Sequence, residues 1–161
     1  MKTVAALVLL SAAAMVAPHV KTPTWRELLA MDLVSKARVR WVQVAADGQR
    51  TVVEIQGGEA YRTNPGISNQ AQPLKYDLSR NRKLEKALKG ANWSAPNKRD
   101  PREGDRTLEL LAEADAGWVV VGSWTAPLKN WQRGKWAPIA DELEPLMKVQ
   151  ADVFGTMKTV E

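Results

Sequence analysis

The chain has no cysteine and only one histidine, His19, among its 161 residues. The missing cysteine excludes disulfide bonds, thiol catalysis and iron–sulfur ligation. The single histidine lies in the expected N-terminal tail or leader, which excludes a Ser-His-Asp triad, and one histidine leaves too few ligands for most zinc sites. A phosphate-binding loop is also missing, because Gly57-Gly58 does not continue into the G-K-[S/T] that such a loop requires. We therefore expect no catalytic residues, no metal site and no cofactor.

Paired carboxylates are the catalytic chemistry that these exclusions leave open. Glu109 and Glu113 share one face of an expected strand, and Glu54 and Glu59 flank an expected turn. General acid–base catalysis needs two carboxylates in different environments across a cleft. Alternating glutamates on a strand are instead typical of the solvated face of a half-buried sheet. The sequence thus favours a protein that is not an enzyme.

Long apolar runs are missing except at the N-terminus. Met1-Lys2 gives a positive start, Val4–Leu10 is an unbroken apolar run, and small residues then lead to Pro18. This order is typical of a secretory signal peptide. The alternative, a retained membrane anchor, would need about 20 apolar residues. We predict a signal peptide over residues 1–17 and a periplasmic or secreted mature protein with no membrane span once the leader is removed.

Residues 18–161 are long enough for a single small domain with one hydrophobic core. Without disulfides, packing alone must stabilise it. The charge is uneven: residues 35–106 carry 15 Lys and Arg against 8 Asp and Glu, whereas residues 107–161 carry 5 against 8. A basic first half indicates either an anionic partner or a surface that is merely well solvated, and we favour the second interpretation.

Turn signals and alternating residues predict two β-hairpins. The first surrounds the turn dipeptide Asp47-Gly48, and the second surrounds Asp115-Ala116-Gly117. Thr24 and Glu27 form a capping-box pattern at the start of the first helix. Residues 57–78 read as a long irregular loop. Helices are expected over residues 24–37, over residues 80–89 with Ser79 as its cap, and over residues 139–154, where Pro145 favours a start near Glu144.

The resulting order is helix, then hairpin–helix, then hairpin–helix. It predicts an α+β fold in which two hairpins form a four-stranded antiparallel sheet and the helices pack on one face. The two hairpin–helix segments resemble each other in pattern, so a tandem ββα repeat is a further hypothesis. Such a fold does not fix a function.

Tryptophan is abundant, with seven residues, and four of them lie within residues 118–136. The segment 126–138, called here the Trp/basic loop, alternates tryptophans with cations. This composition suits stacking on sugar rings or contact with a partner protein. Alternatively, the tryptophans fold back over the sheet edge or the last helix, an interpretation that we favour for Trp136 and leave open for Trp131. The candidate binding residues of this loop are Lys129, Trp131, Arg133, Lys135 and Trp136.

The expected helix over residues 80–89 has a strongly basic face. Only Glu85 opposes its cations, so the face could bind an anionic ligand such as a lipid headgroup, a phosphate polymer or an acidic protein. A solvated face is the plainer interpretation. The candidate binding residues of this helix are Arg82, Lys83, Lys86 and Lys89.

Two function classes remain from the sequence. The first is an exported, non-enzymatic binding module that acts on another envelope or secreted protein, as an inhibitor, an immunity factor or an envelope-assembly partner. The second is a binder of anionic glycan or cell-wall polymer through the Trp/basic loop and the basic helix. Nucleic acid is the least favoured partner because of the export signal.

Overall fold

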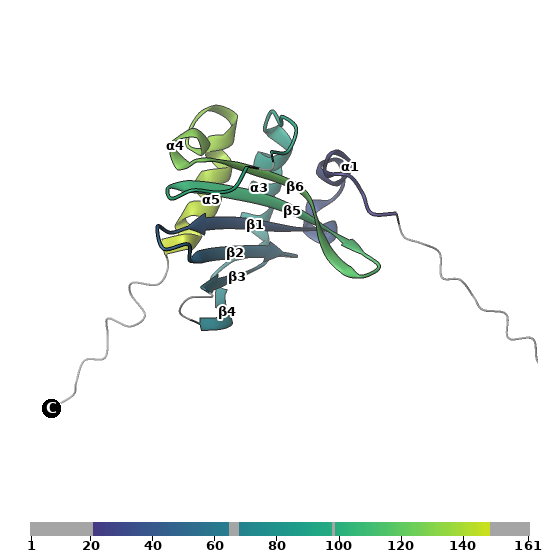
Figure 1. Cartoon of the computed structure of the whole chain (residues 1–161). Helices are drawn as coiled ribbons and strands as arrows, with labels where there is room; N and C mark the ends of the chain where they lie inside the picture. Colours follow the sequence, from purple (N-terminus) through teal and green to yellow (C-terminus); the bar gives the residue numbers. More distant parts are fainter. Residues whose placement is uncertain (1–20, 65–67, 98, 149–161) are drawn as a thin grey trace, which may run out of the picture.

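The computed structural model describes residues 21–64, 68–97 and 99–148 of the chain (Figure 1). The predicted signal peptide, His19 and the predicted end of the last helix at residues 149–154 lie outside these ranges. In the part that is described, no helix combines the length and the apolar character needed to cross a membrane.

Six strands and five helices, with one 3₁₀ turn, make up the described residues. The strands are β1 (Ala37–Val44), β2 (Arg50–Gln56), β3 (Glu59–Asn64), β4 (Ser68–Leu74), β5 (Asp105–Ala114) and β6 (Gly117–Pro127). The helices are α1 (Trp25–Ala30), α2 (Leu33–Lys36), α3 (Leu78–Gly90), α4 (Leu128–Trp131) and α5 (Ala137–Lys148), with the 3₁₀ turn η1 (Gly134–Trp136) before α5.

The strands form one antiparallel sheet of six strands in the order β4-β3-β2-β1-β5-β6. The predicted four-stranded sheet is therefore wrong, although the α+β character holds. The missing pair is the hairpin β3–β4, which occupies the segment predicted to be a loop. Gly57 and Gly58, read as the end of a strand, form a tight turn at φ values of 60° and 88°, a region open mainly to glycine.

The β3–β4 hairpin is hard to recognise because its strands are mostly polar. β4 is an edge strand, and its Pro73 reads as a strand breaker in sequence, yet proline is tolerated in an edge strand, which has a partner on one side only. This hairpin also contradicts the tandem ββα hypothesis, since four strands precede α3 whereas two precede α5.

The helix ends differ in detail from the predictions. The capping box is confirmed: the Thr24 Oγ1 accepts from the Glu27 N–H, and the Glu27 carboxylate accepts from the Thr24 N–H. The first helix ends early, and a break at Met31 separates α1 from α2. Asp77 rather than Ser79 caps α3. α5 begins at Ala137, and Pro145 lies exposed within it.

The core lies between the sheet and the helices, which cover one of its faces. Along β1, Ala37, Val39 and Trp41 point into this core, whereas Arg38 and Arg40 alternate with them on the opposite face. Leu28, Leu84 and Leu143 bring α1, α3 and α5 into the same cluster. The opposite face of the sheet carries no helix in the described residues (Figure 1).

Candidate functional site

Six of the seven tryptophans pack ring to ring in one continuous series. The centroid distances along the series Trp25, Trp124, Trp93, Trp136, Trp131 and Trp41 are 5.4, 4.5, 4.5, 4.7 and 5.0 Å, mostly with edge-to-face geometry. This arrangement places the positive ring edge against the negative ring face. The series links α1, β6, η1, α4 and β1 through residues far apart in the sequence.

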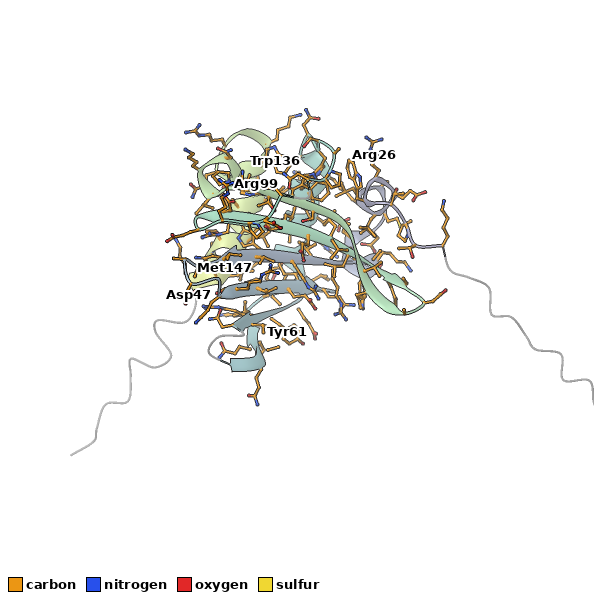
Figure 2. The ribbon with its side chains drawn as sticks, viewed as in Figure 1. Arg26, Asp47, Tyr61, Arg99, Trp136 and Met147 are labelled. Atoms are coloured by element: carbon orange, nitrogen blue, oxygen red, sulfur yellow. The ribbon has the colours of Figure 1, made fainter. Side chains whose placement is uncertain are left out.

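The series places the two tryptophans of the Trp/basic loop differently. Trp131 is only 2% exposed, and its Nε1 donates to the Arg106 carbonyl at 3.1 Å. It is therefore a core residue. Trp136 is half-buried, packs on Trp93 and Trp131, and has no acceptor for its Nε1 within the described residues. Figure 2 shows Trp136 in the upper part of the molecule, between the ribbons of α3 and α4.

Gly122 makes room for this packing. A Cβ at this position would lie 2.6 Å from the Trp124 ring and 3.0 Å from the Trp25 Cβ. The glycine follows an irregularity in the register between β5 and β6, at Leu110 and Leu111. A β-bulge of this kind changes the direction of neighbouring side chains. Here the Trp124 side chain, close to the bulge, points toward α1.

A buried polar network lies beneath the tryptophans. Arg106 on β5 donates from two nitrogens to the Glu144 carboxylate of α5, at 2.9 and 2.7 Å, and Trp41 Nε1 donates to the same carboxylate at 3.0 Å. Burial alone would raise the pKa of Glu144. The hydrogen bonds from Arg106 and Trp41, with the charges of Arg106 and Lys148, outweigh burial and hold the pKa below its ordinary value.

The lowered pKa of Glu144 makes the stability of the fold depend on pH. A carboxylate whose folded-state pKa is depressed stabilises the fold above its unfolded pKa, near 4.5, and loses that contribution as pH falls through the folded value. We expect the free energy of unfolding, measured with urea, to decrease as the pH falls below about 4.5. In Glu144→Gln the drop should be smaller and the neutral-pH stability lower. An equal pH dependence in both proteins would contradict this assignment.

A small pocket opens beside the tryptophan series. Its volume is about 210 Å³. Loop 94–97 holds one wall in place: Trp124 Nε1 donates to the Ser94 carbonyl, and the Asn97 side chain exchanges two hydrogen bonds with the Thr125 backbone. The pocket, called here the Trp pocket, is lined by Ser94, Asn97, Trp124, Thr125, Ala126, Asn130, Trp131 and Trp136.

The predicted cations all lie at the surface. In the Trp/basic loop these are Lys129, Arg133 and Lys135, and on α3 they are Arg82, Lys83, Lys86 and Lys89. Lys89 pairs with Glu85 at 2.6 Å. Arg80, at the start of the helix, instead ties α3 to α5 through Glu142.

The structure brings the two predicted basic segments together. α3 contacts η1 directly. Trp93 links them further, since its Nε1 donates to the Leu88 carbonyl at the end of α3 while its ring packs on Trp136 at 4.5 Å. Figure 2 shows several nitrogen-tipped side chains along this upper edge. Sequence reasoning treated the two segments as separate surfaces, and here they adjoin beside the Trp pocket.

The open face of the sheet is a second candidate surface, which sequence reasoning missed. A groove of about 620 Å³ runs across all six strands. At its centre, Glu54 accepts from Arg40 at 2.6 Å and from Arg38 at 3.0 Å. Figure 2 places Tyr61 near the lower end of this face. The groove is lined by Arg40, Val42, Arg50, Val52, Glu54, Tyr61, Thr63, Ala71, Glu109 and Val120.

Two of the carboxylates considered for catalysis, Glu54 and Glu59, are held by hydrogen bonds from other side chains. Glu54 is held by its two arginines, and Glu59 accepts from the Tyr61 hydroxyl at 2.9 Å, which raises the pKa of Tyr61. Across residues 21–64, 68–97 and 99–148, no three acidic or histidine side chains gather as metal ligands.

Comparison of the chain with protein-family models, with curated proteins and with solved structures finds no match. The geometry of the two surfaces is therefore the basis for any functional proposal.

Proposed function

We propose that this protein is an exported, non-enzymatic binder of an anionic polymer, which it contacts through the Trp/basic loop and α3 together. The observation that carries this proposal is the contact between α3 and η1, which joins two exposed basic segments into one surface. Several cations on neighbouring elements can pair with successive charges of a polymer, and their summed field also attracts it from solution.

The acidic side chains on these elements leave most of this charge unbalanced. On α3, Glu85 is engaged by Lys89. On α5, Glu142 is engaged by Arg80. Lys83, Lys86 and Arg133 form no ion pair within the described residues, so they remain available to an anionic ligand.

Charge reversal on either segment should weaken polymer binding. We expect Lys86→Glu on α3 and Arg133→Glu in the loop each to reduce affinity for immobilised polygalacturonate about tenfold at low salt, about 1.4 kcal/mol. The two effects should roughly add in the double variant, because the side chains share no direct partner. Binding of the parent should also weaken steeply with ionic strength.

The matched control is Arg50→Glu, the same charge change in an exposed side chain on the open face of the sheet. It should leave polymer binding unchanged. Equal losses in all three single variants would mean that net charge, rather than this surface, controls binding, and no loss in Lys86→Glu or Arg133→Glu would overturn the proposal.

A protein partner is the second candidate function, and the open groove favours it. Val120 is 49% exposed at one end of the groove, and Arg50 has no ion-pair partner in the described part of the chain. A partner protein with an apolar side chain beside a carboxylate would match both. The Trp/basic loop supports this function less than the sequence indicated, because its Trp131 is buried and cannot anchor a partner. Capture of an envelope protein that survives Lys86→Glu and fails in Arg50→Glu would favour this candidate.

A further inference from the structure

We propose that the Trp pocket holds one sugar ring of the bound polymer, so that the polymer is an anionic glycan rather than a polyphosphate. This inference rests on the proposed function and specifies its ligand. The inference begins from the position of the pocket. Three of its lining residues, Asn130, Trp131 and Trp136, alternate along the chain with the cations of the Trp/basic loop.

The size of the pocket suits a single ring. Its volume of about 210 Å³ is below the roughly 300–1,000 Å³ of sites for drug-sized molecules. A pyranose ring displaces a similar volume, whereas an extended phosphate chain does not need a pocket.

The apolar part of the lining consists of Ala126 and three indole groups: Trp136, which is half-buried and offers the most surface, and Trp124 and Trp131, which are only 3% and 2% exposed. Aromatic rings offer large flat apolar surfaces of defined geometry. A sugar ring has C–H groups on its faces that can pack against such surfaces. A phosphate chain has no apolar face, so it would gain nothing from these walls.

The polar part of the lining keeps donors and acceptors free for hydroxyl groups. The Asn97 amide and the Thr125 hydroxyl are already used, by the Thr125 backbone and by Thr107. In contrast, the Asn130 amide, the Ser94 hydroxyl and the Trp136 Nε1 make no hydrogen bond with any described residue. These three groups can form hydrogen bonds with the hydroxyls of the ring. Small-molecule sites typically combine a few such polar groups with an otherwise apolar lining.

The charge around the pocket fixes the class of sugar. Lys129 precedes Asn130, and Lys135 precedes Trp136, so each cation is attached next to a lining residue. Both are exposed. A ring that carries a carboxylate, as in a uronic acid, can place its C–H face on the indoles and its charge toward these lysines. A neutral sugar would leave the cations without partners.

The test compares an oligogalacturonate with a polyphosphate of equal charge by isothermal titration calorimetry. The variant Asn130→Leu/Ser94→Ala removes two free polar groups without touching the tryptophan series, and Asn92→Ala, exposed in the same loop region as Ser94, is its control. We expect the oligogalacturonate to bind the parent more tightly, the double variant to weaken its binding about tenfold, and polyphosphate binding to remain unchanged.

The outcomes separate this inference from the proposed function. If both probes bind equally well and the pocket variant changes neither, the surface binds polyanions but the pocket holds no ring, and the inference is overturned while the proposed function stands. If neither probe binds the parent, both fail. Thermal unfolding of Asn130→Leu/Ser94→Ala checks that any loss of binding is not a loss of folding.

Discussion

Arg106→Met should destabilise the protein by about 3–5 kcal/mol, because it leaves the Glu144 carboxylate buried without its cation. Arg106 and Glu144 are only 6% and 8% exposed, and their two hydrogen bonds join β5 to α5. The loss also affects Trp41 Nε1, whose acceptor would then become protonated more readily. Urea unfolding followed by circular dichroism measures the change directly.

The double variant Arg106→Met/Glu144→Leu is the control for this prediction. Replacing both members of a buried ion pair by apolar side chains of similar size is often neutral or stabilising. We therefore expect the double variant to recover most of the stability lost in Arg106→Met. The Trp41 N–H would then lose its acceptor, so a residual cost of about 1–3 kcal/mol is expected. A double variant less stable than Arg106→Met would show that the network acts through something other than uncompensated charge.

Trp131→Ala should also cost about 3–5 kcal/mol, because it removes a buried indole and leaves a cavity. The side chain touches both Trp41 and Trp136, so its removal interrupts the tryptophan series and frees the Arg106 carbonyl. If Trp131 were a surface contact, the same change would alter binding and leave the unfolding midpoint unchanged. Because Trp131 also lines the Trp pocket, polymer binding should weaken as well, so the fall in the unfolding midpoint, measured by thermal unfolding, decides between these two roles.

The matched control for Trp131→Ala is Trp118→Ala. Trp118 lies on β6 outside the series, half-buried under the guanidinium of Arg38 at 4.4 Å from its ring centroid. We expect it to cost less than Trp131→Ala, since it interrupts no ring-to-ring packing. Equal costs for the two substitutions would contradict the larger contribution that deeper burial and ring-to-ring packing give to Trp131.

Two local signals in the sequence, a turn dipeptide and a capping box, are confirmed by the structure. Asp47-Gly48 predicts the turn between β1 and β2, and the structure pairs Val44 with Arg50 around it. The Thr24 capping box follows from residues three apart. The exclusions based on cysteine and histidine need no structure at all. In each case, the residues that determine the feature are neighbours in the chain.

The features that sequence reasoning missed depend on contacts between distant residues. β3 and β4 contain few apolar residues because they complete the sheet at its edge, so no alternation marks them. The groove on the open face exists only once all six strands are paired. Arg106 and Glu144 are 38 residues apart and look like ordinary surface charges in the sequence. They form a buried ion pair only because the fold packs α5 against β5.

The candidate site was partly accessible from the sequence. The nine candidate binding residues were chosen by composition, and seven of them are exposed cations. Their grouping into one surface could not be predicted, because it depends on Trp93 packing between α3 and η1. The burial of Trp131 was also undetermined, since tryptophan suits cores and contact surfaces equally well.

The tryptophan series has an optical consequence. Six indoles held at centroid distances of 4.5–5.4 Å in fixed orientations couple their electronic transitions, so they absorb and emit as a group rather than as separate chromophores. Near-ultraviolet circular dichroism should therefore be intense in the folded protein and collapse when tertiary packing is lost, even where helices and strands persist. Because Trp124, Trp131 and Trp136 belong to the series and also line the Trp pocket, light emitted by the series can report what occupies that pocket.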